Sequence, residues 1–151
     1  MTYGYLMDVI TYLKRIRHLI RTNIYYHTEK FGKKTILVKG RKFIVEVADT
    51  VKKRRLGLMY RNSIKKNEGM IFVYGDDSKH SIWMFNTRFR LDIIWLNNKK
   101  KVVDMFENAE PCKSIFDCPL HLSKRISRYT LELPKGSIKE MNLKIGNTIR
   151  F

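Results

Sequence analysis

The chain of 151 residues lacks any uninterrupted apolar run long enough for a membrane-spanning helix or for the core of a signal peptide. It also lacks internal repeats and low-complexity segments. Charged residues make up 30% of the sequence, a share that excludes an integral membrane protein, while 44% hydrophobic residues suffice for one compact core. We therefore expect a cytoplasmic protein with a single core.

Acidic residues are scarce: 14 Asp and Glu stand against 31 Lys and Arg, which gives a net charge of +17. Residues 1–42 hold ten basic and two acidic residues, so this short segment carries nearly half of the excess. Such a charge attracts nucleic acids, anionic lipid surfaces and acidic ligands without sequence specificity. A general excess of Lys is also common in proteins adapted to heat or salt, so the charge reflects either function or habitat.

Apolar residues recur at spacings of three and four over residues 5–24, and basic residues fill most positions between them. This pattern predicts a basic amphipathic helix within an extension of residues 1–34, followed by a single domain over residues 35–151. The apolar stripe packs on the domain or on a second copy of the chain, or it lies on an anionic membrane surface. Packing on protein is favoured, a peripheral membrane location is the alternative, and the oligomeric state stays open.

From residue 35 onward the apolar period changes from helical to alternating, which predicts β-strands. The first two strands form a hairpin with Gly40 in its turn, since glycine accepts the backbone conformation that a tight turn needs. Asp49 or Thr50 caps a short helix through Met59, and another short helix begins at Ser137. The expected fold class is mainly β (α+β), with a small barrel-like or strongly curved antiparallel or mixed sheet. Strands are expected at residues 35–38, 42–47, 69–74, 79–85, 89–96, 101–106, 128–133 and 147–151, with a turn at 75–78 and a long loop through 112–118.

The stretch SIWMFNT at residues 81–87 is an apolar run that ends abruptly in Asn86 and Thr87. Side chains alternate along a strand, and both faces of this run are apolar up to these two residues, so we expect them at the rim of the core. Asp92 follows on the next strand and is expected at the border between solvent and core, close to the same bend.

Two interpretations of this cluster are open. In the structural one, the polar pair holds a turn through side-chain hydrogen bonds to the backbone, and Asp92 pairs with Arg90, Arg88 or Arg61. In the functional one, the cluster forms a cleft for a small polar ligand, walled by an aromatic ring and lined by convergent polar groups. The ligand-binding residues of that cleft would be Arg61, Trp83, Asn86, Thr87 and Asp92.

Motifs across residues 36–151 resemble, in order and spacing, the signature of the domain of unknown function 192 family. They are GLMYR (57–61), GMIFVY (69–74), WMFNT (83–87), LD (91–92), EPC (110–112), CP (118–119), YTLEL (129–133) and GN (146–147). The resemblance implies a small, mostly β, barrel-like domain whose activity is not established. Members of the family usually have Pro where this chain has Arg90, which frees the backbone there and adds a guanidinium beside Asp92.

The two cysteines, Cys112 and Cys118, share one loop with Asp117 and His121. Together these four side chains could hold a zinc ion, although their spacing differs from the compact Cys-x-x-Cys knuckle. A disulfide that clips the loop is a further possibility. Because a reducing cytoplasm keeps thiols free, a pair of ordinary or redox-active thiols is favoured.

The favoured function is a cytoplasmic module that binds a small polar ligand in a cleft near Trp83, Asn86 and Asp92. One alternative is a peripheral membrane-surface or non-specific nucleic-acid adaptor that acts through the basic helix. The other is an enzyme or redox protein that uses Cys112 and Cys118. No Ser or Cys stands in a recognised motif with a His, and the sequence indicates no cofactor.

Overall fold

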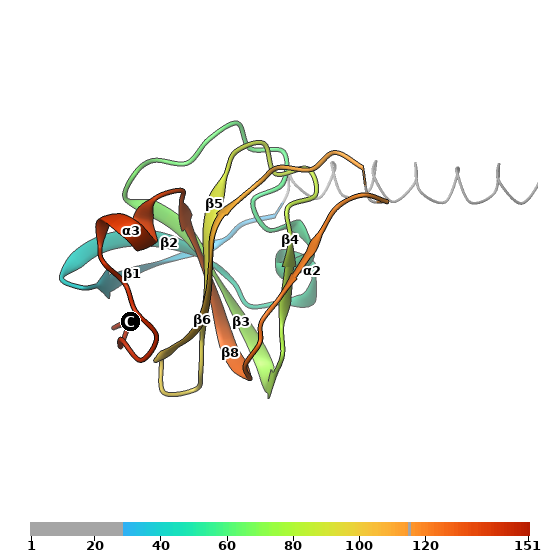
Figure 1. Cartoon of the computed structure of the whole chain (residues 1–151). Helices are drawn as coiled ribbons and strands as arrows, with labels where there is room; N and C mark the ends of the chain where they lie inside the picture. The colour runs from blue at the N-terminus through green and yellow to red at the C-terminus, as the bar shows by residue number, and fades with distance from the viewer. Residues whose placement is uncertain (1–28, 115) are drawn as a thin grey trace, which may run out of the picture. The chain divides into compact units, whose positions relative to one another are not determined.

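The computed structural model describes residues 29–114 and 116–151 (Figure 1). The chain divides into two compact units, Met1–Lys30 and Phe31–Phe151, and the second unit holds every described strand and helix. The amphipathic helix expected over residues 5–24 lies outside the described residues, as do its expected contacts with protein, membrane or nucleic acid.

The second unit is mainly β, as expected. Its main sheet has six strands in the order β1-β2-β3-β8-β5-β6 (Figure 1). β2 and β3 run parallel and all other neighbours run antiparallel, so the sheet is mixed. Its strands are β1 (Gly32–Val38), β2 (Arg41–Ala48), β3 (Glu68–Ser78), β5 (Leu91–Leu96), β6 (Val102–Ala109) and β8 (Ser127–Pro134).

The predicted hairpin at the start of the domain is confirmed. β1 pairs with β2 in antiparallel register from Gly32↔Val47 to Val38↔Arg41. The two residues between the strands, Lys39 and Gly40, both have positive φ, of 51° and 80°. A two-residue turn of this kind matches the right-handed twist of the strands that it joins.

Of the two expected forms, barrel-like or strongly curved antiparallel or mixed sheet, the mixed sheet is confirmed and a closed barrel is not formed: among the described residues no continuous ladder joins β1 to β6. The strand expected over residues 147–151 is also absent. Its residues make only the isolated bridges Leu37↔Arg150 and Lys101↔Thr148. These bridges tie the C-terminal segment to the ends of both edge strands, but they are too few to close a barrel, which requires a complete ladder.

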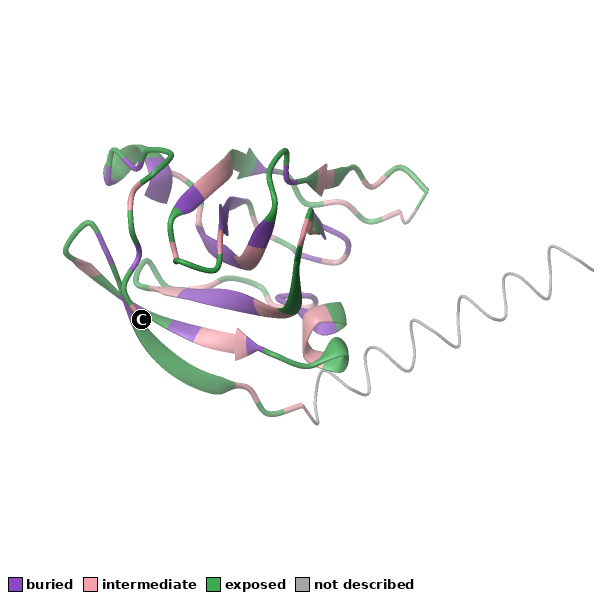
Figure 2. Cartoon of the chain, turned by 90° about the horizontal axis from the view of Figure 1, so that it is seen from below, coloured by how far each residue is buried: buried purple, intermediate pink, exposed green. Residues whose placement is uncertain are grey.

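The main sheet packs a hydrophobic core on each face, because side chains alternate along its strands. On β8, Leu131 belongs to one core, together with Ile71 and Ile94 of the neighbouring strands. Met70 and Ile93, one residue earlier on those same strands, belong to the other core. Buried residues accordingly run along the central strands (Figure 2). The first core also holds Ile138 of helix α3 (Ser137–Glu140), which starts at the predicted residue, although Gly136 is its cap residue and the capping box of Ser137 and Glu140 is not formed.

Helix α2 (Val51–Leu56) begins at the predicted cap, where the backbone N–H of Lys53 donates to Thr50 Oγ1 at 3.2 Å. It ends before Met59, the expected last residue, because Gly57 has a φ of 50° and leaves the helical conformation. The chain then turns over the second core, where Leu58 and Met59 are buried.

A separate two-stranded sheet pairs β4 (Ser81–Trp83) with β7 (Leu120–Leu122). β4 is shorter than the strand expected over 79–85, because Asn86 has a φ of 55° and the chain bends after Phe85. β7 lies just beyond the expected long loop, and no strand was predicted there. β3 continues through Ser78, where a turn was expected.

Candidate functional site

Asp92 is fully buried and not at the border between solvent and core, where we expected it. Its Oδ1 accepts a hydrogen bond from the backbone N–H of Asn108 at 2.9 Å, and its Oδ2 accepts one from the backbone N–H of Ile138 at 2.8 Å. The carboxylate thus ties the end of β6 and the first turn of α3 to β5. It faces α3, on the face of the sheet opposite to its neighbour Ile93.

The arginines predicted to pair with Asp92 have other partners. Arg61 forms a two-pronged ion pair with Glu46 on β2, through N–O contacts of 3.0 and 2.5 Å. Arg90 pairs with Glu110 at 2.7 Å, and Arg88 donates to the side chain of Asn62 at 2.7 Å. The pairing of Asp92 with Arg90, Arg88 or Arg61, which the structural interpretation expected, is therefore wrong. The Asp92 carboxylate is instead satisfied by backbone N–H groups within the core.

Asn86 and Thr87 lie in a turn, but the hydrogen bonds that hold it differ from the side-chain-to-backbone bonds that the structural interpretation expected. The backbone N–H of Asn86 donates to the carbonyl of Cys112 at 3.0 Å, and its carbonyl accepts from the N–H of Tyr60 at 2.9 Å. The Asn86 side-chain amide donates to Tyr60 Oη at 3.1 Å. The N–H of Thr87 donates to the carbonyl of Met84 at 3.1 Å. These bonds fix the bend between β4 of the two-stranded sheet and β5 of the main sheet.

A pocket does lie beside this bend, but on a different set of residues. We call it the α2–β4 pocket; its cavity volume is about 330 Å³, within the range of small-molecule sites. Of the five residues predicted to bind ligand, only Trp83 and Thr87 line it. Its walls come from α2 and the turn after it, β3, the β4–β7 sheet and β8. The lining residues are Val51, Arg54, Arg55, Leu56, Gly57, Leu58, Met59, Phe72, Tyr74, Ser81, Ile82, Trp83, Thr87, Leu120 and Glu132.

Glu132 is the one acidic residue among those that line this pocket, and it was not predicted from the sequence. It is 4% exposed on the central strand β8, between Met70 of β3 and Ile93 of β5. Its Oε2 atom is buried and accepts no hydrogen bond from the described residues. Burial raises the pKa of this carboxyl from 4.5 to about 8, and the nearby charge of Arg61 offsets only part of that rise. Glu132 is thus largely protonated at neutral pH.

A sequence signal for Glu132 existed. In the run YTLEL (129–133), Leu131 and Leu133 share one face of the strand. Thr130 and Glu132 share the other face. A glutamate on a central strand with both faces buried is unusual, because burying an unpaired carboxylate is costly. Only the structure shows that β8 is central, and the burial of Leu131 and Glu132 shows that both of its faces are covered.

Aromatic side chains form much of the pocket wall. The Tyr74 hydroxyl lies 3.3 Å from the Thr130 hydroxyl, and burial raises the pKa of Tyr74 to about 12. Trp83 is 39% exposed and its ring lies 5.1 Å from that of Phe85. Leu120, opposite Trp83 in the β4–β7 pairing, is 62% exposed. The pocket therefore opens to solvent along an apolar lip.

Two guanidinium groups also line the pocket. Arg54 is fixed: its Nη1 donates to the carbonyls of Asp49 and Val73 at 2.9 and 2.8 Å, and its guanidinium lies 5.5 Å from the Tyr74 ring centre. Arg55 is exposed and makes no ion pair or hydrogen bond with the part of the chain that the structure describes. The guanidinium of Arg54 is thus held in place, and that of Arg55 is available to contact a ligand.

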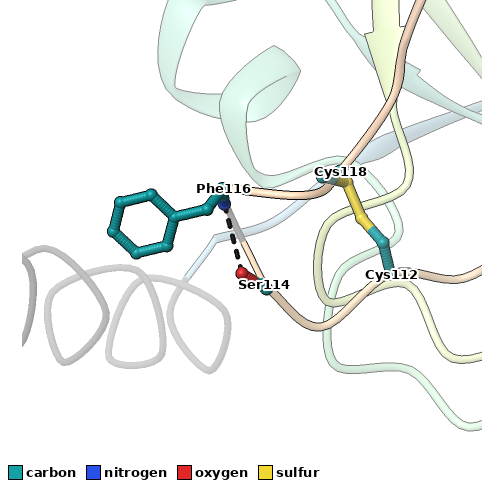
Figure 3. Close-up of a disulfide and its surroundings, with 4 residues drawn as sticks. All are labelled: Cys112, Ser114, Phe116 and Cys118. Carbon is teal, nitrogen blue, oxygen red and sulfur yellow. Dashed lines mark hydrogen bonds between the residues drawn. A yellow bond between two sulfur atoms is a disulfide. The ribbon is translucent and has the colours of Figure 1, made fainter.

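The two cysteines form a disulfide, so the expectation of free thiols is wrong (Figure 3). The Cα atoms of Cys112 and Cys118 are 5.5 Å apart, within the range for a disulfide. Cys112 is anchored by a bridge to Phe85, and the backbone N–H of Phe116 donates to Ser114 Oγ at 3.2 Å within the loop. The bond holds the start of β7 beside the end of β4, next to the pocket lip.

Breaking this disulfide should lower the free energy of unfolding by about 2 kcal/mol, the loop-closure value for two residues six positions apart. Urea denaturation of the wild type with and without a dithiol reductant measures the effect. A variant with Cys112→Ser and Cys118→Ser is the control and should not respond to reductant. A wild-type midpoint that reductant leaves unchanged would show that the bond does not brace the fold.

The zinc site considered from the sequence is not formed. The thiols are joined to each other, and no three His, Cys, Asp or Glu side chains of the described residues are grouped to hold a metal ion. The ring of His121 instead packs 4.2 Å from that of Phe106, and burial lowers the pKa of His121. The redox function considered from the sequence would thus have to begin with reduction of the Cys112–Cys118 disulfide.

Residues 29–114 and 116–151 include no helix long and apolar enough to cross a membrane. A cytoplasmic location and a role at a membrane surface or on nucleic acid stay predictions.

The chain is similar to several proteins without an assigned activity. A UPF0127 protein of Thermococcus gammatolerans is 34% identical over 109 residues, which cover 71% of this chain but only 65% of that protein, so the chain spans less than two thirds of that relative. A UPF0127 protein of Pyrococcus furiosus is 30% identical over 122 residues, or 76% of this chain and 94% of that one.

Two solved structures share the fold. A Sinorhizobium meliloti protein, proposed to be a transcription regulator, matches with a TM-score of 0.73 and 28% identity over 81% of this chain and 95% of that one. A Novosphingobium aromaticivorans protein of unknown function matches with a TM-score of 0.69 and 24% identity over 80% of this chain and 85% of that one. The sequence signature of DUF192, described as "Uncharacterized ACR", matches residues 34–151, so this chain belongs to the DUF192 family.

Proposed function

We propose that this protein binds a small organic molecule with a polar group in the α2–β4 pocket, where Glu132 is the polar contact. The observation that carries the proposal is that Glu132 lines the pocket while its buried Oε2 atom has no hydrogen-bond partner among the described residues. An unsatisfied buried polar atom costs about 1–3 kcal/mol. Proteins tolerate such a cost chiefly at sites where function requires the group.

The chemistry of the pocket favours binding over catalysis. Its lining holds no His or Cys, so none of the described side chains there forms a pair of nucleophile and base of the usual kind. Its aromatic and aliphatic walls suit the apolar body of a ligand, and a single carboxyl group among them suits one oriented hydrogen bond. The proposed site is therefore next to the cleft that the sequence suggested, but turned to the opposite face of the sheet from Asp92.

A fragment screen by two-dimensional amide NMR tests the proposal. Fragments that bind should shift the backbone amides of Gly57, Trp83 and Glu132. Trp83→Leu should weaken the best fragment about tenfold with little change in stability, because the indole is partly exposed and forms one wall of the pocket.

Leu122→Ala is the matched control for the Trp83 variant. Leu122 lies on the same two-stranded sheet and is 54% exposed, but it does not line the pocket. This change should leave fragment affinity within about twofold. Equal losses in the two variants, or fragments that shift only amides outside the pocket, would contradict the proposal.

A further inference from the structure

The charged groups of the α2–β4 pocket are distributed unevenly. Its charged lining residues are Arg54 and Arg55 on α2 and Glu132 on β8. Arg54 is held by two backbone carbonyls, whereas Arg55 is exposed and has no partner among the described residues. The accessible charge of the pocket is therefore positive, and it lies on the helix that forms one wall.

The carboxyl group of Glu132 does not cancel this charge at neutral pH. The titratable groups that interact with it are Arg61, from the segment after α2, and Tyr74 of β3, whose ring also lies 5.5 Å from the guanidinium of Arg54 on α2. Burial outweighs their effect and keeps the pKa of Glu132 at about 8. The protonated carboxyl is a hydrogen-bond donor, and a donor needs an acceptor on the ligand.

We propose that the ligand is a small organic anion, a carboxylate on an apolar body of about the size of one ring, with its charge held between Arg55 and the carboxyl O–H of Glu132. This inference rests on the proposed function and adds the chemical class of the ligand. The ring-sized body fits the aromatic and aliphatic walls made by Phe72, Tyr74 and Trp83. A single available guanidinium suits a single negative charge.

A cationic ligand fits the same pocket poorly. It would be repelled by both arginines, and it would have to ionise Glu132 within an apolar surrounding. The net charge of +17 also repels cations from the protein as a whole. An anion meets none of these costs.

The test uses the full chain and three probes of matched shape: benzoate, benzamide and benzylamine. Binding is measured by amide NMR at pH 6, 7, 8 and 9, with fixed ionic strength. Benzoate should bind with a dissociation constant of about 1 mM, a usual value for so small a molecule. Its affinity should fall about tenfold per pH unit above pH 8, where Glu132 loses its proton while benzoate stays ionised throughout.

Three variants separate the two contacts. Arg55→Gln should weaken benzoate about fivefold, and Arg125→Gln, the same charge change at an exposed arginine outside the pocket, should not. Glu132→Gln keeps a donor but cannot ionise, so benzoate should bind it with an affinity that no longer depends on pH between 7 and 9. If Glu132 had only a structural role, benzoate binding by the wild type and by Glu132→Gln would depend on pH in the same way.

The outcomes distinguish the ligand class from the site itself. Benzylamine that shifts the pocket amides and binds more tightly as pH rises would overturn the anion and leave the pocket as the binding site. Benzamide equal to benzoate, with no effect of Arg55→Gln, would overturn the charge requirement. If none of the three probes shifts the pocket amides, the anion proposal fails, and the fragment screen then decides on the pocket alone.

Discussion

Replacing Asp92 by Asn should lower the free energy of unfolding by about 2–3 kcal/mol, visible as a lower urea midpoint with an unchanged slope. The carboxylate accepts one backbone N–H on each oxygen, from Asn108 and from Ile138. Asparagine keeps one acceptor but turns an NH₂ group toward the other N–H. A buried backbone donor then has no partner, and both the end of β6 and the first turn of α3 lose a charge-assisted hydrogen bond.

Asp117→Asn is the matched control, because Asp117 is exposed and accepts no hydrogen bond from the described residues. It should change stability by no more than about 0.5 kcal/mol. Fragment affinity should be the same in Asp92→Asn and in the wild type, since Asp92 faces α3 and does not line the pocket. A stable Asp92→Asn variant that loses ligand binding would restore the cleft expected from the sequence.

Glu132→Gln should make the protein more stable at pH 7 by about 3 kcal/mol. The carboxyl of Glu132 has a pKa of about 8 when folded and 4.5 as its ordinary value. Between these pH values the unfolded chain releases the proton while the folded protein holds it, so the contribution of Glu132 to stability is fully present below pH 4.5 and is lost as pH rises through 8. Glutamine is neutral at every pH and removes this loss.

Urea denaturation at pH 4.5, 7 and 9 measures the effect as the difference between the wild type and the variant. Comparing the two proteins removes the effects of other groups, such as the carboxyls of Asp76 and Asp77, whose lowered pKa values act in the opposite direction. The difference should be near zero at pH 4.5 and grow to roughly 4–5 kcal/mol at pH 9. A difference that stays constant across this range would show that Glu132 is ionised when folded.

The predicted gain in stability bears on function. Residues chosen only for stability would not include an acid whose removal strengthens the fold, whereas binding sites often hold groups that are poorly satisfied when empty. The substitutions Asp92→Asn and Glu132→Gln are therefore expected to change the free energy of unfolding in opposite directions. The two replaced side chains are both buried carboxyl groups on central strands, yet one should stabilise the fold and the other should weaken it.

Local chemistry was enough to predict several elements of this fold from the sequence. The hairpin at Lys39 and Gly40, the helix cap at Thr50 and the helix start at Ser137 each depend on residues within one turn of each other. Alternation of apolar residues likewise predicts the strands around residues 91–96 and 127–134, since the period of two follows from the strand itself. The motifs of the DUF192 family are visible at this level too.

The tertiary structure alone decided which face each polar residue occupies. Asp92 and Asn86 are near one another in sequence, but the sheet places the carboxylate of Asp92 against α3, away from the pocket beside Asn86 and Trp83. Glu132 enters the pocket only because β8 pairs between β3 and β5, strands that are far from it in sequence. A local pattern determines the alternation of side chains, whereas burial, and with it the raised pKa of Glu132, depends on which distant strands pack around that pattern.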